Sequence, residues 1–188
     1  MIEVLTTFHE AGWQQYGKRM VNNFLEHWPK DIKIHLYCEN VKTGLDDPRV
    51  VEHDIFDSCP EIKQYLDENN NDYNNGVRNG KRDFKFDAIK FCYKVFAQCH
   101  RIKESKADTL IFIDADTVTF GKPPISEILQ LLPEDNFTAY IGRPNNKKLP
   151  FAETGYIMYN IKHPNIIEFA NVFKDLYTSG KIFDLEYQ

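Results

Sequence analysis

The chain has 188 residues, enough for one domain with a hydrophobic core and too few for two comfortable ones. Hydrophobic residues make up 42% of it and aromatic residues 14%, a composition that excludes a disordered chain. The formal charge of −5 argues against a protein that binds nucleic acid by neutralising its backbone. A local cationic pocket for a single nucleotide remains compatible with that charge.

The N-terminus carries no signal-peptide pattern, and no stretch approaches the roughly 20 apolar residues of a membrane span. The four cysteines form no C-x-x-C pair. Cys92 and Cys99 lie seven residues apart in a helical pattern and are expected to be small core residues rather than zinc ligands. We therefore expect a reduced, cytoplasmic protein.

Strands and helices alternate in the first part of the chain. Residues 2–8 predict a strand, and residues 13–28 predict a helix with one apolar face, which Pro29 ends. Residues 32–38 alternate apolar and polar side chains, which predicts a strand with one face less buried than the other. Two shorter elements follow, a strand near residues 50–51 and a helix near residues 60–67.

An asparagine-rich segment at residues 69–83 predicts a loop. Asp83 is placed to cap a long helix at residues 84–104. The inward stripe of this helix consists of Ile89, Cys92, Phe96 and Cys99, and another face carries Asp87, Lys90, Lys94 and Arg101.

Residues 109–113 contain four consecutive apolar residues without alternation, which predicts a central parallel strand covered on both faces. Pro123 and Pro124 then break the chain. A short helix near residues 125–132, strands at residues 137–142 and 155–160, and a last helix from Pro164 to Tyr177 follow. Residues 1–188 are thus expected to form a single layered α/β/α domain with a mainly parallel sheet.

Asp114-Ala115-Asp116 directly follows the central strand. Residues i and i+2 of an extended segment project to the same side, so both carboxylates are expected to face one ligand. Carboxylate oxygens are ligands that a hard cation such as Mn²⁺ or Mg²⁺ takes. In open α/β sheets, ligands bind beyond the carboxyl ends of the strands. The segment therefore predicts metal ligands at Asp114 and Asp116.

The apolar strand before the Asp-x-Asp motif makes the motif more specific. With 15 Asp among 188 residues, about one Asp-x-Asp triplet is expected by chance. Requiring four apolar residues before the triplet lowers that expectation to roughly 0.04. The alternative is a pair of Asp residues that only form a turn after a strand, which is a common use of Asp.

Ile111-Phe-Ile-Asp-Ala-Asp-Thr-Val118 resembles the D-x-D segment of GT-A-fold glycosyltransferases, the class that includes the glycogenin and lipopolysaccharide galactosyltransferase family. Three further segments agree with this class in chain order. The first strand ends in Thr6-Thr7-Phe8, where that fold contacts the nucleobase. Lys90 and Lys94 lie on the helix before the D-x-D strand, and Glu153-Thr-Gly-Tyr-Ile-Met-Tyr-Asn160 is similar to the "N-A-G-hydrophobic-hydrophobic-x-N" strand beside the sugar.

The resemblance implies a hexosyltransferase that moves a sugar from a nucleoside-diphosphate donor, with a UDP-sugar favoured, to a saccharide or to a protein or lipid glycan. Asp114 and Asp116 would hold Mn²⁺ or Mg²⁺ on the diphosphate. Lys90 and Lys94 would stabilise the leaving phosphate, and Glu153 would bind sugar hydroxyls or act as a base. The donor contacts implied are Thr6, Thr7, Phe8, Arg82 as part of a lid, Asp87, Asp114, Thr154 and Gly155.

One departure concerns the C-terminal region. Many members of this class supply a third metal ligand there, often a His, and no His follows His163 in this sequence. Either the domain is a shortened version, or the chain is a fragment truncated at the C-terminus that lacks the acceptor-binding element.

Other functions compete with this interpretation. In a haloacid-dehalogenase-type phosphatase, Asp114 would be the nucleophile and Asp116 the acid/base, but that motif usually follows the first strand and needs a later acidic pair. A non-catalytic GT-A-like module would bind the nucleotide-sugar without transfer. In the simplest case the Asp pair is only a turn. The donor base, the sugar and the acceptor are not encoded in any motif.

Overall fold

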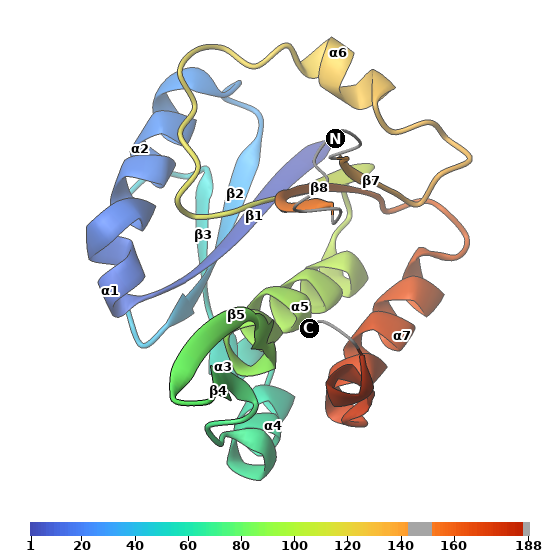
Figure 1. The fold of residues 1–188 in the computed structure, drawn as a ribbon. Helices are drawn as coiled ribbons and strands as arrows, with labels where there is room; N and C mark the ends of the chain where they lie inside the picture. Colours follow the sequence, from blue (N-terminus) through green and yellow to red (C-terminus); the bar gives the residue numbers. More distant parts are fainter. Residues whose placement is uncertain (143–151, 186–188) are drawn as a thin grey trace.

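A six-stranded sheet forms the middle layer of the fold in the computed structural model, which describes residues 1–142 and 152–185 (Figure 1). The strands run in the spatial order β3-β2-β1-β6-β8-β7. The first four are parallel, β8 is antiparallel to β6, and β7 is antiparallel to β8. Their bounds are β1 Ile2–His9, β2 Lys33–Glu39, β3 Val50–Asp54, β6 Thr109–Ile113, β7 Thr138–Ile141 and β8 Glu153–Asn160.

Helices cover both faces of this sheet (Figure 1). One face is covered by a continuous helical run, made of α1 Glu10–Gly12, a π-helical turn Trp13–Gly17 and α2 Lys18–His27, and by α6 Ile125–Gln130. The other face carries α3 Ile55–Ser58, α4 Glu61–Asn69, α5 Ala88–Glu104 and α7 Ile166–Thr178, after which a 3₁₀ turn spans Lys181–Asp184. The layered α/β/α architecture with a mainly parallel sheet is confirmed. Within residues 1–142 and 152–185, every helix is too short or too polar to traverse a bilayer.

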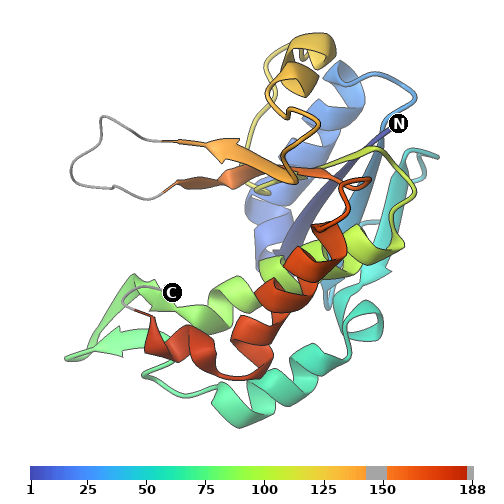
Figure 2. The same ribbon diagram turned by 90° about the vertical axis from the view of Figure 1, so that its right-hand side faces the viewer.

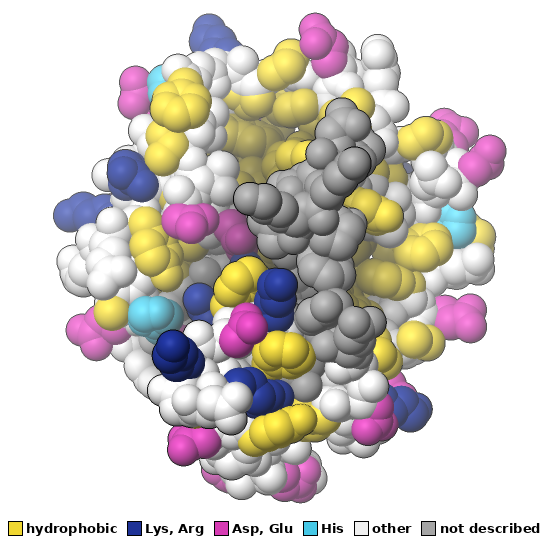
Figure 3. Space-filling view, in the orientation of Figure 1, with side chains coloured by type: hydrophobic (Ala, Val, Ile, Leu, Met, Phe, Trp, Pro, Cys, Tyr) yellow, Lys and Arg dark blue, Asp and Glu magenta, His cyan; other side chains and the backbone are white. Residues whose placement is uncertain are grey.

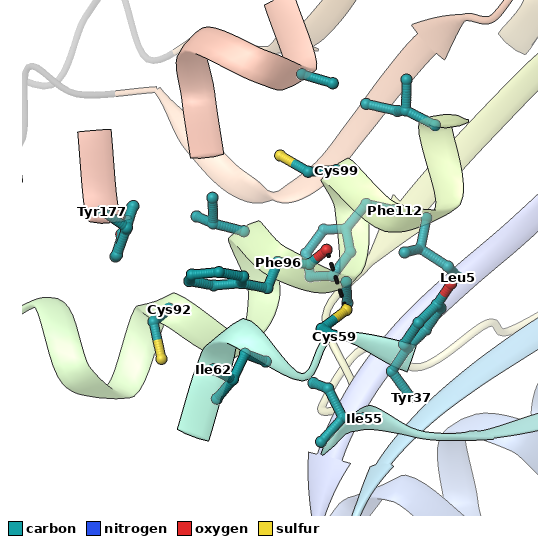
Figure 4. Close-up of a cluster of buried hydrophobic side chains, with 14 of the residues drawn as sticks. Leu5, Tyr37, Ile55, Cys59, Ile62, Cys92, Phe96, Cys99, Phe112 and Tyr177 are labelled. Atoms are coloured by element: carbon teal, nitrogen blue, oxygen red, sulfur yellow. Dashed lines mark hydrogen bonds between the residues drawn. The ribbon is translucent and has the colours of Figure 1, made fainter. Parts of the chain in front are cut away.

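The core between the sheet and α5 contains three of the four cysteines as separate apolar residues (Figure 4). Cys59 donates its thiol hydrogen to the Phe96 carbonyl at 3.6 Å, while Cys92 and Cys99 lie along α5 among aliphatic and aromatic side chains. All four thiols are free and buried, and burial raises the pKa of each. The prediction that Cys92 and Cys99 are core residues is confirmed.

The later part of the asparagine-rich segment forms a β-hairpin, so its prediction as a loop is wrong in part. Strand β4 Asn75–Arg78 pairs with β5 Lys81–Asp87. Asn79 and Gly80 both have positive φ, at 51° and 72°, as a two-residue hairpin turn requires. Helix α5 consequently begins at Ala88, and its N-cap is Asp87 rather than Asp83, with Asp87 Oδ1 accepting from the Lys90 N–H.

Strand β2 is more buried than its alternating sequence predicts. All five residues from Ile34 to Cys38 are buried, because α5 covers the face that carries His35 and Tyr37. Two polar atoms on this face lie within hydrogen-bond distance of a histidine nitrogen: His35 Nδ1 lies 2.9 Å from His53 Nε2, and the Tyr37 hydroxyl lies 2.7 Å from His100 Nδ1. The expectation of a less buried face is therefore wrong.

A buried ion pair joins the start of β1 to the last turns of α5. Arg101 donates to Glu3 Oε2 from Nε at 3.0 Å and from Nη2 at 2.8 Å, and the Ser105 hydroxyl donates to the same oxygen at 2.8 Å. Burial acts to raise the pKa of Glu3, but the nearby His35 ring at 3.7 Å and the hydrogen bonds from Ser105 and Arg101 outweigh it and hold the pKa at about 2. The pair therefore stabilises the fold through the ionised form of Glu3.

Replacing Glu3 with Gln should lower the free energy of unfolding at pH 7 by about 2–3 kcal/mol, because Arg101 is left charged and buried without its partner. The depressed pKa gives the sign of the pH dependence. Wild-type stabilisation is complete above the ordinary value of 4.5 and is lost as pH falls toward about 2. Urea unfolding should thus show the difference between wild type and variant shrinking across that window.

The matched control is Glu61→Gln, which breaks the half-exposed Lys174–Glu61 pair at 2.7 Å. This change should cost less than about 1 kcal/mol because the pair is hydrated. Equal losses in the two variants would show that the Glu3 pair contributes no more than a surface contact.

Candidate active site at the carboxyl ends of β1 and β6

The connections of the sheet diverge between β1 and β6. The chain runs outward from β1 through β2 to β3, and then α5 carries it back to β6 on the other side of β1. A crevice is expected beyond the carboxyl ends of two neighbouring parallel strands at such a point. Thr7 and Phe8 end β1 there, and Asp114 follows β6.

A hollow of about 660 Å³ opens beside these strand ends. Its walls come from the end of β1, the first helical turns, the end of β2, the β4–β5 hairpin and the first turns of α5. Three cationic side chains from the hairpin and α5 take part, namely Arg82, Lys90 and Lys94. Figure 2 shows the hairpin and the β7–β8 pair extending from the same side of the molecule.

Basic and acidic side chains are mixed over the part of the surface around the hairpin, as the space-filling view shows (Figure 3). Within the hollow, the three cations of α5 and the hairpin are accompanied by only two acidic side chains, Glu10 and Glu39. Two of these cations are also paired with carboxylates beside the hollow, Arg82 with Asp87 and Lys94 with Asp114. The gathering of three cationic side chains on one wall suits a compact anion.

Asp114 and Asp116 lie on a turn rather than on an extended strand. Strand β6 ends at Ile113, and the Thr117 N–H donates to the Asp114 carbonyl at 3.0 Å. The Asp114 carboxylate forms an ion pair with the Lys94 ammonium, so α5 links it to the hollow. Asp116 is exposed. The expected strand geometry is therefore replaced by a turn.

Tyr16 shows that the two carboxylates share one neighbourhood. This residue comes from the π-helical turn and lines the hollow. Burial raises the pKa of its phenol, and the negative charges of Asp116 and Asp114 raise it further. Both acidic side chains therefore act on the same point at the edge of the hollow, despite the turn.

Gly155 allows β8 to approach Asp114 closely. Its carbonyl accepts from the Asp114 N–H at 2.8 Å, and its own N–H donates to Glu153 Oε1 at 3.0 Å. A Cβ at this position would lie 3.1 Å from Asp114 Oδ2 and 3.1 Å from Glu153 Oε1. The register of β7 against β8 is irregular over the same residues. Gly155 therefore lies in close contact with Asp114 at an irregularity in the β7–β8 pairing.

Asp87 connects the hairpin to the start of α5. Its side chain is 1% exposed, and its Oδ2 accepts from Arg82 Nε at 2.9 Å and from Nη2 at 2.6 Å. Its other oxygen caps the helix at the Lys90 N–H. A buried carboxylate thus holds a guanidinium, itself 62% exposed, at the wall of the hollow.

The structure brings most of the predicted site residues into one region, with exceptions. Five of them line the hollow: Thr7, Phe8, Arg82, Lys90 and Lys94. Thr6 is fully buried and does not line it; this residue lies two positions before Phe8 in β1, farther from the end of the strand. Around the Asp114 turn lie Glu153 and Gly155, with the exposed Thr154 between them in the chain.

Sequence reasoning missed Tyr93, Glu39 and Tyr16 as residues of the hollow. The Tyr93 hydroxyl donates to Glu39 Oε1 at 3.2 Å, and burial together with the Glu39 charge raises the pKa of Tyr93. A signal for Tyr93 was present, since it lies three residues after Lys90 on the same helix face. For Glu39, the sequence offered only its position at the end of a predicted strand.

The two carboxylates fit a divalent cation that arrives with further oxygen ligands. Carboxylate oxygens are suitable ligands for Mn²⁺ or Mg²⁺. Among the described residues, however, no group of three or more His, Cys, Asp or Glu side chains gathers to hold a metal ion. Two protein ligands leave most of an octahedral shell to other donors, as is usual for Mg²⁺ bound with substrate phosphates.

Two solved glycosyltransferase structures share this architecture. The mouse xyloside xylosyltransferase 1 apo form superposes with a TM-score of 0.58 at 11% identity, over 96% of this chain and 74% of that one. The apo form of the glycosyltransferase GlyE of Streptococcus pneumoniae TIGR4 gives 0.57 at 16% identity, over 98% and 40%. The chain thus has a GT-A-like glycosyltransferase fold and spans about two fifths of the length of GlyE. No family model and no curated protein matches the sequence.

Replacing Gly155 with Ala should lower the free energy of unfolding by about 1 kcal/mol, because the new methyl group must displace the Asp114 and Glu153 carboxylates. Gly121→Ala is the matched control, since a Cβ there meets nothing within 4 Å. Thermal unfolding of both variants measures the difference. Equal melting temperatures would contradict the close approach of β8 to Asp114.

Proposed function

We propose that this chain is a metal-dependent glycosyltransferase domain that transfers a sugar from a nucleoside-diphosphate donor. The observation that carries the proposal is the Asp114–Asp116 turn beside a cation-lined hollow, at the point of a GT-A-like fold where the strand connections diverge. A UDP-sugar is the donor to test first, and a saccharide or a protein or lipid glycan is the acceptor class.

The chemistry of transfer explains why these residue types would be needed. When the nucleoside diphosphate leaves, negative charge develops on its β-phosphate, and fixed cations lower the cost of that charge. A divalent cation on the diphosphate would supply part of this stabilisation when bound, with Asp114 and Asp116 as its protein ligands. Lys90 and Lys94 would face the phosphates from α5, and Arg82 from the hairpin.

The remaining roles follow from position in the hollow. Thr7 and Phe8 at the end of β1 would contact the nucleoside, together with the Glu39 and Tyr93 pair. Glu153 lies against Gly155 beside Asp114, which suits a residue that hydrogen-bonds sugar hydroxyls or accepts a proton from the acceptor. Asp87 would act through Arg82, which it holds.

A domain that binds the nucleotide-sugar without transfer is the second candidate. The observation that favours it is that no third metal-ligating side chain joins the two carboxylates among the described residues. Turnover separates the two functions: donor hydrolysis or transfer beside metal-dependent UDP binding indicates an enzyme, and binding alone indicates the module. The phosphatase alternative would instead hydrolyse phosphate monoesters without binding UDP.

Replacing Asp116 with Asn should weaken Mn²⁺-dependent UDP binding by more than about tenfold, because the amide is a far poorer ligand than the carboxylate. The fold should survive, since Asp116 is exposed at the end of the strand. Isothermal titration with UDP in the presence and absence of Mn²⁺ measures the loss, and thermal unfolding checks the fold.

Asp135→Asn is the matched control, because Asp135 is an exposed turn aspartate that takes no part in the hollow. It should bind UDP with Mn²⁺ as wild type does. The proposed function is wrong if Asp116→Asn retains wild-type affinity for UDP in the presence of Mn²⁺.

A further inference from the structure

One lysine is shared by the two halves of the site. Lys94 lines the hollow, and its ammonium also forms the ion pair with Asp114. The other α5 lysine, Lys90, lines the same hollow one helical turn earlier and is exposed. Lys94 therefore stands between the space for an anion and a carboxylate proposed as a metal ligand, whereas Lys90 faces the hollow.

The Lys94–Asp114 pair is partly buried. The Lys94 side chain is 24% exposed and that of Asp114 is 25% exposed. The ammonium also lies 5.6 Å from the centre of the Phe91 ring and 5.7 Å from that of Phe112, distances at which a cation is attracted to an aromatic face. Because the pair is partly shielded from water, the Lys94 charge repels a second cation that approaches Asp114.

We propose that Lys94 couples the metal to the nucleotide: it occupies Asp114 until a diphosphate in the hollow offers it another anion, so that metal and diphosphate bind together. This inference rests on the proposed function and concerns how the same site is regulated. Without a diphosphate, a divalent cation at Asp114 would lie beside an ammonium and be repelled by it. With a diphosphate present, Lys94 has a second anionic partner, and Asp114 becomes available.

Thermodynamic linkage makes the coupling reciprocal, so the diphosphate raises metal affinity by the same factor by which the metal raises diphosphate affinity. A site of this kind stays nearly empty of metal in the absence of nucleotide. That behaviour agrees with a ligand set of two carboxylates, one of which already has a cationic partner.

The test measures Mn²⁺ binding to the nucleotide-free protein by titration, with free Mn²⁺ followed by electron paramagnetic resonance. Lys94→Met removes the charge and keeps an apolar side chain that suits the Phe91 and Phe112 rings. The variant should bind Mn²⁺ alone about tenfold more tightly than wild type, because the repelling charge is gone. It should also bind UDP more weakly than wild type in the absence of metal.

Two control variants show whether the gain in Mn²⁺ affinity comes from the release of Asp114. Lys90→Met removes the same charge from the same helix and hollow, and should change Mn²⁺ affinity by less than about twofold, since this lysine is exposed to screening water. In the double variant Lys94→Met, Asp114→Asn, the gain should disappear, because it depends on the released carboxylate. If Lys94→Met does not fold, Lys94→Gln serves in its place, with the same expected direction.

The outcomes separate the inference from the proposed function. If wild type binds UDP with Mn²⁺ but Lys94→Met binds Mn²⁺ alone no more tightly than wild type, the coupling is overturned and the proposed function stands. A gain as large in Lys90→Met also overturns it, because a general charge effect would then explain the result. If wild type fails to bind UDP with Mn²⁺, the proposed function is overturned. The Mn²⁺ titrations then still decide whether Lys94 opposes metal binding at Asp114.

Discussion

The position of α5 across the sheet is the constraint on which the site depends. Its C-terminal part is fixed to β1 by the buried Arg101–Glu3 pair, and its middle packs on the sheet through Phe96 and Cys99. Its N-terminal part is capped by Asp87, and Lys94 reaches Asp114 beyond β6. Because the helix is held at both ends and in the middle, Lys90 and Lys94 have fixed positions relative to the carboxyl ends of β1 and β6.

Much of the fold follows from local pattern. The unbroken apolar run at residues 110–113 indicated a central strand, and the structure places it between β1 and β8. The hairpin was missed although Asn79-Gly80 is a strong hairpin signal, because the surrounding asparagines were interpreted as a loop. Strand β2 was misjudged because the burial of its polar residues depends on α5, which lies fifty residues further along the chain.

Part of the candidate site was predictable because its residues follow the strand ends, and Arg82, Lys90 and Lys94 were implied by the family resemblance. The motif at Asp114 and Asp116 and the residues Thr7 and Phe8 lie where parallel strands terminate, so order along the chain was enough to bring them together. The pairing of Glu39 with Tyr93 and the placement of Lys94 against Asp114 depend on tertiary geometry. Neither contact could be predicted from the spacing of residues in the sequence, since the partners come from elements that meet only in the folded chain.

The burial of all four thiols has a practical consequence for optical work on this protein. Their raised pKa values keep them protonated and slow toward maleimides at neutral pH. A single cysteine introduced on the exposed tip of the hairpin, for instance at Lys81, would consequently be the fast-reacting thiol. A fluorophore could then be attached beside the hollow with every native cysteine left in place.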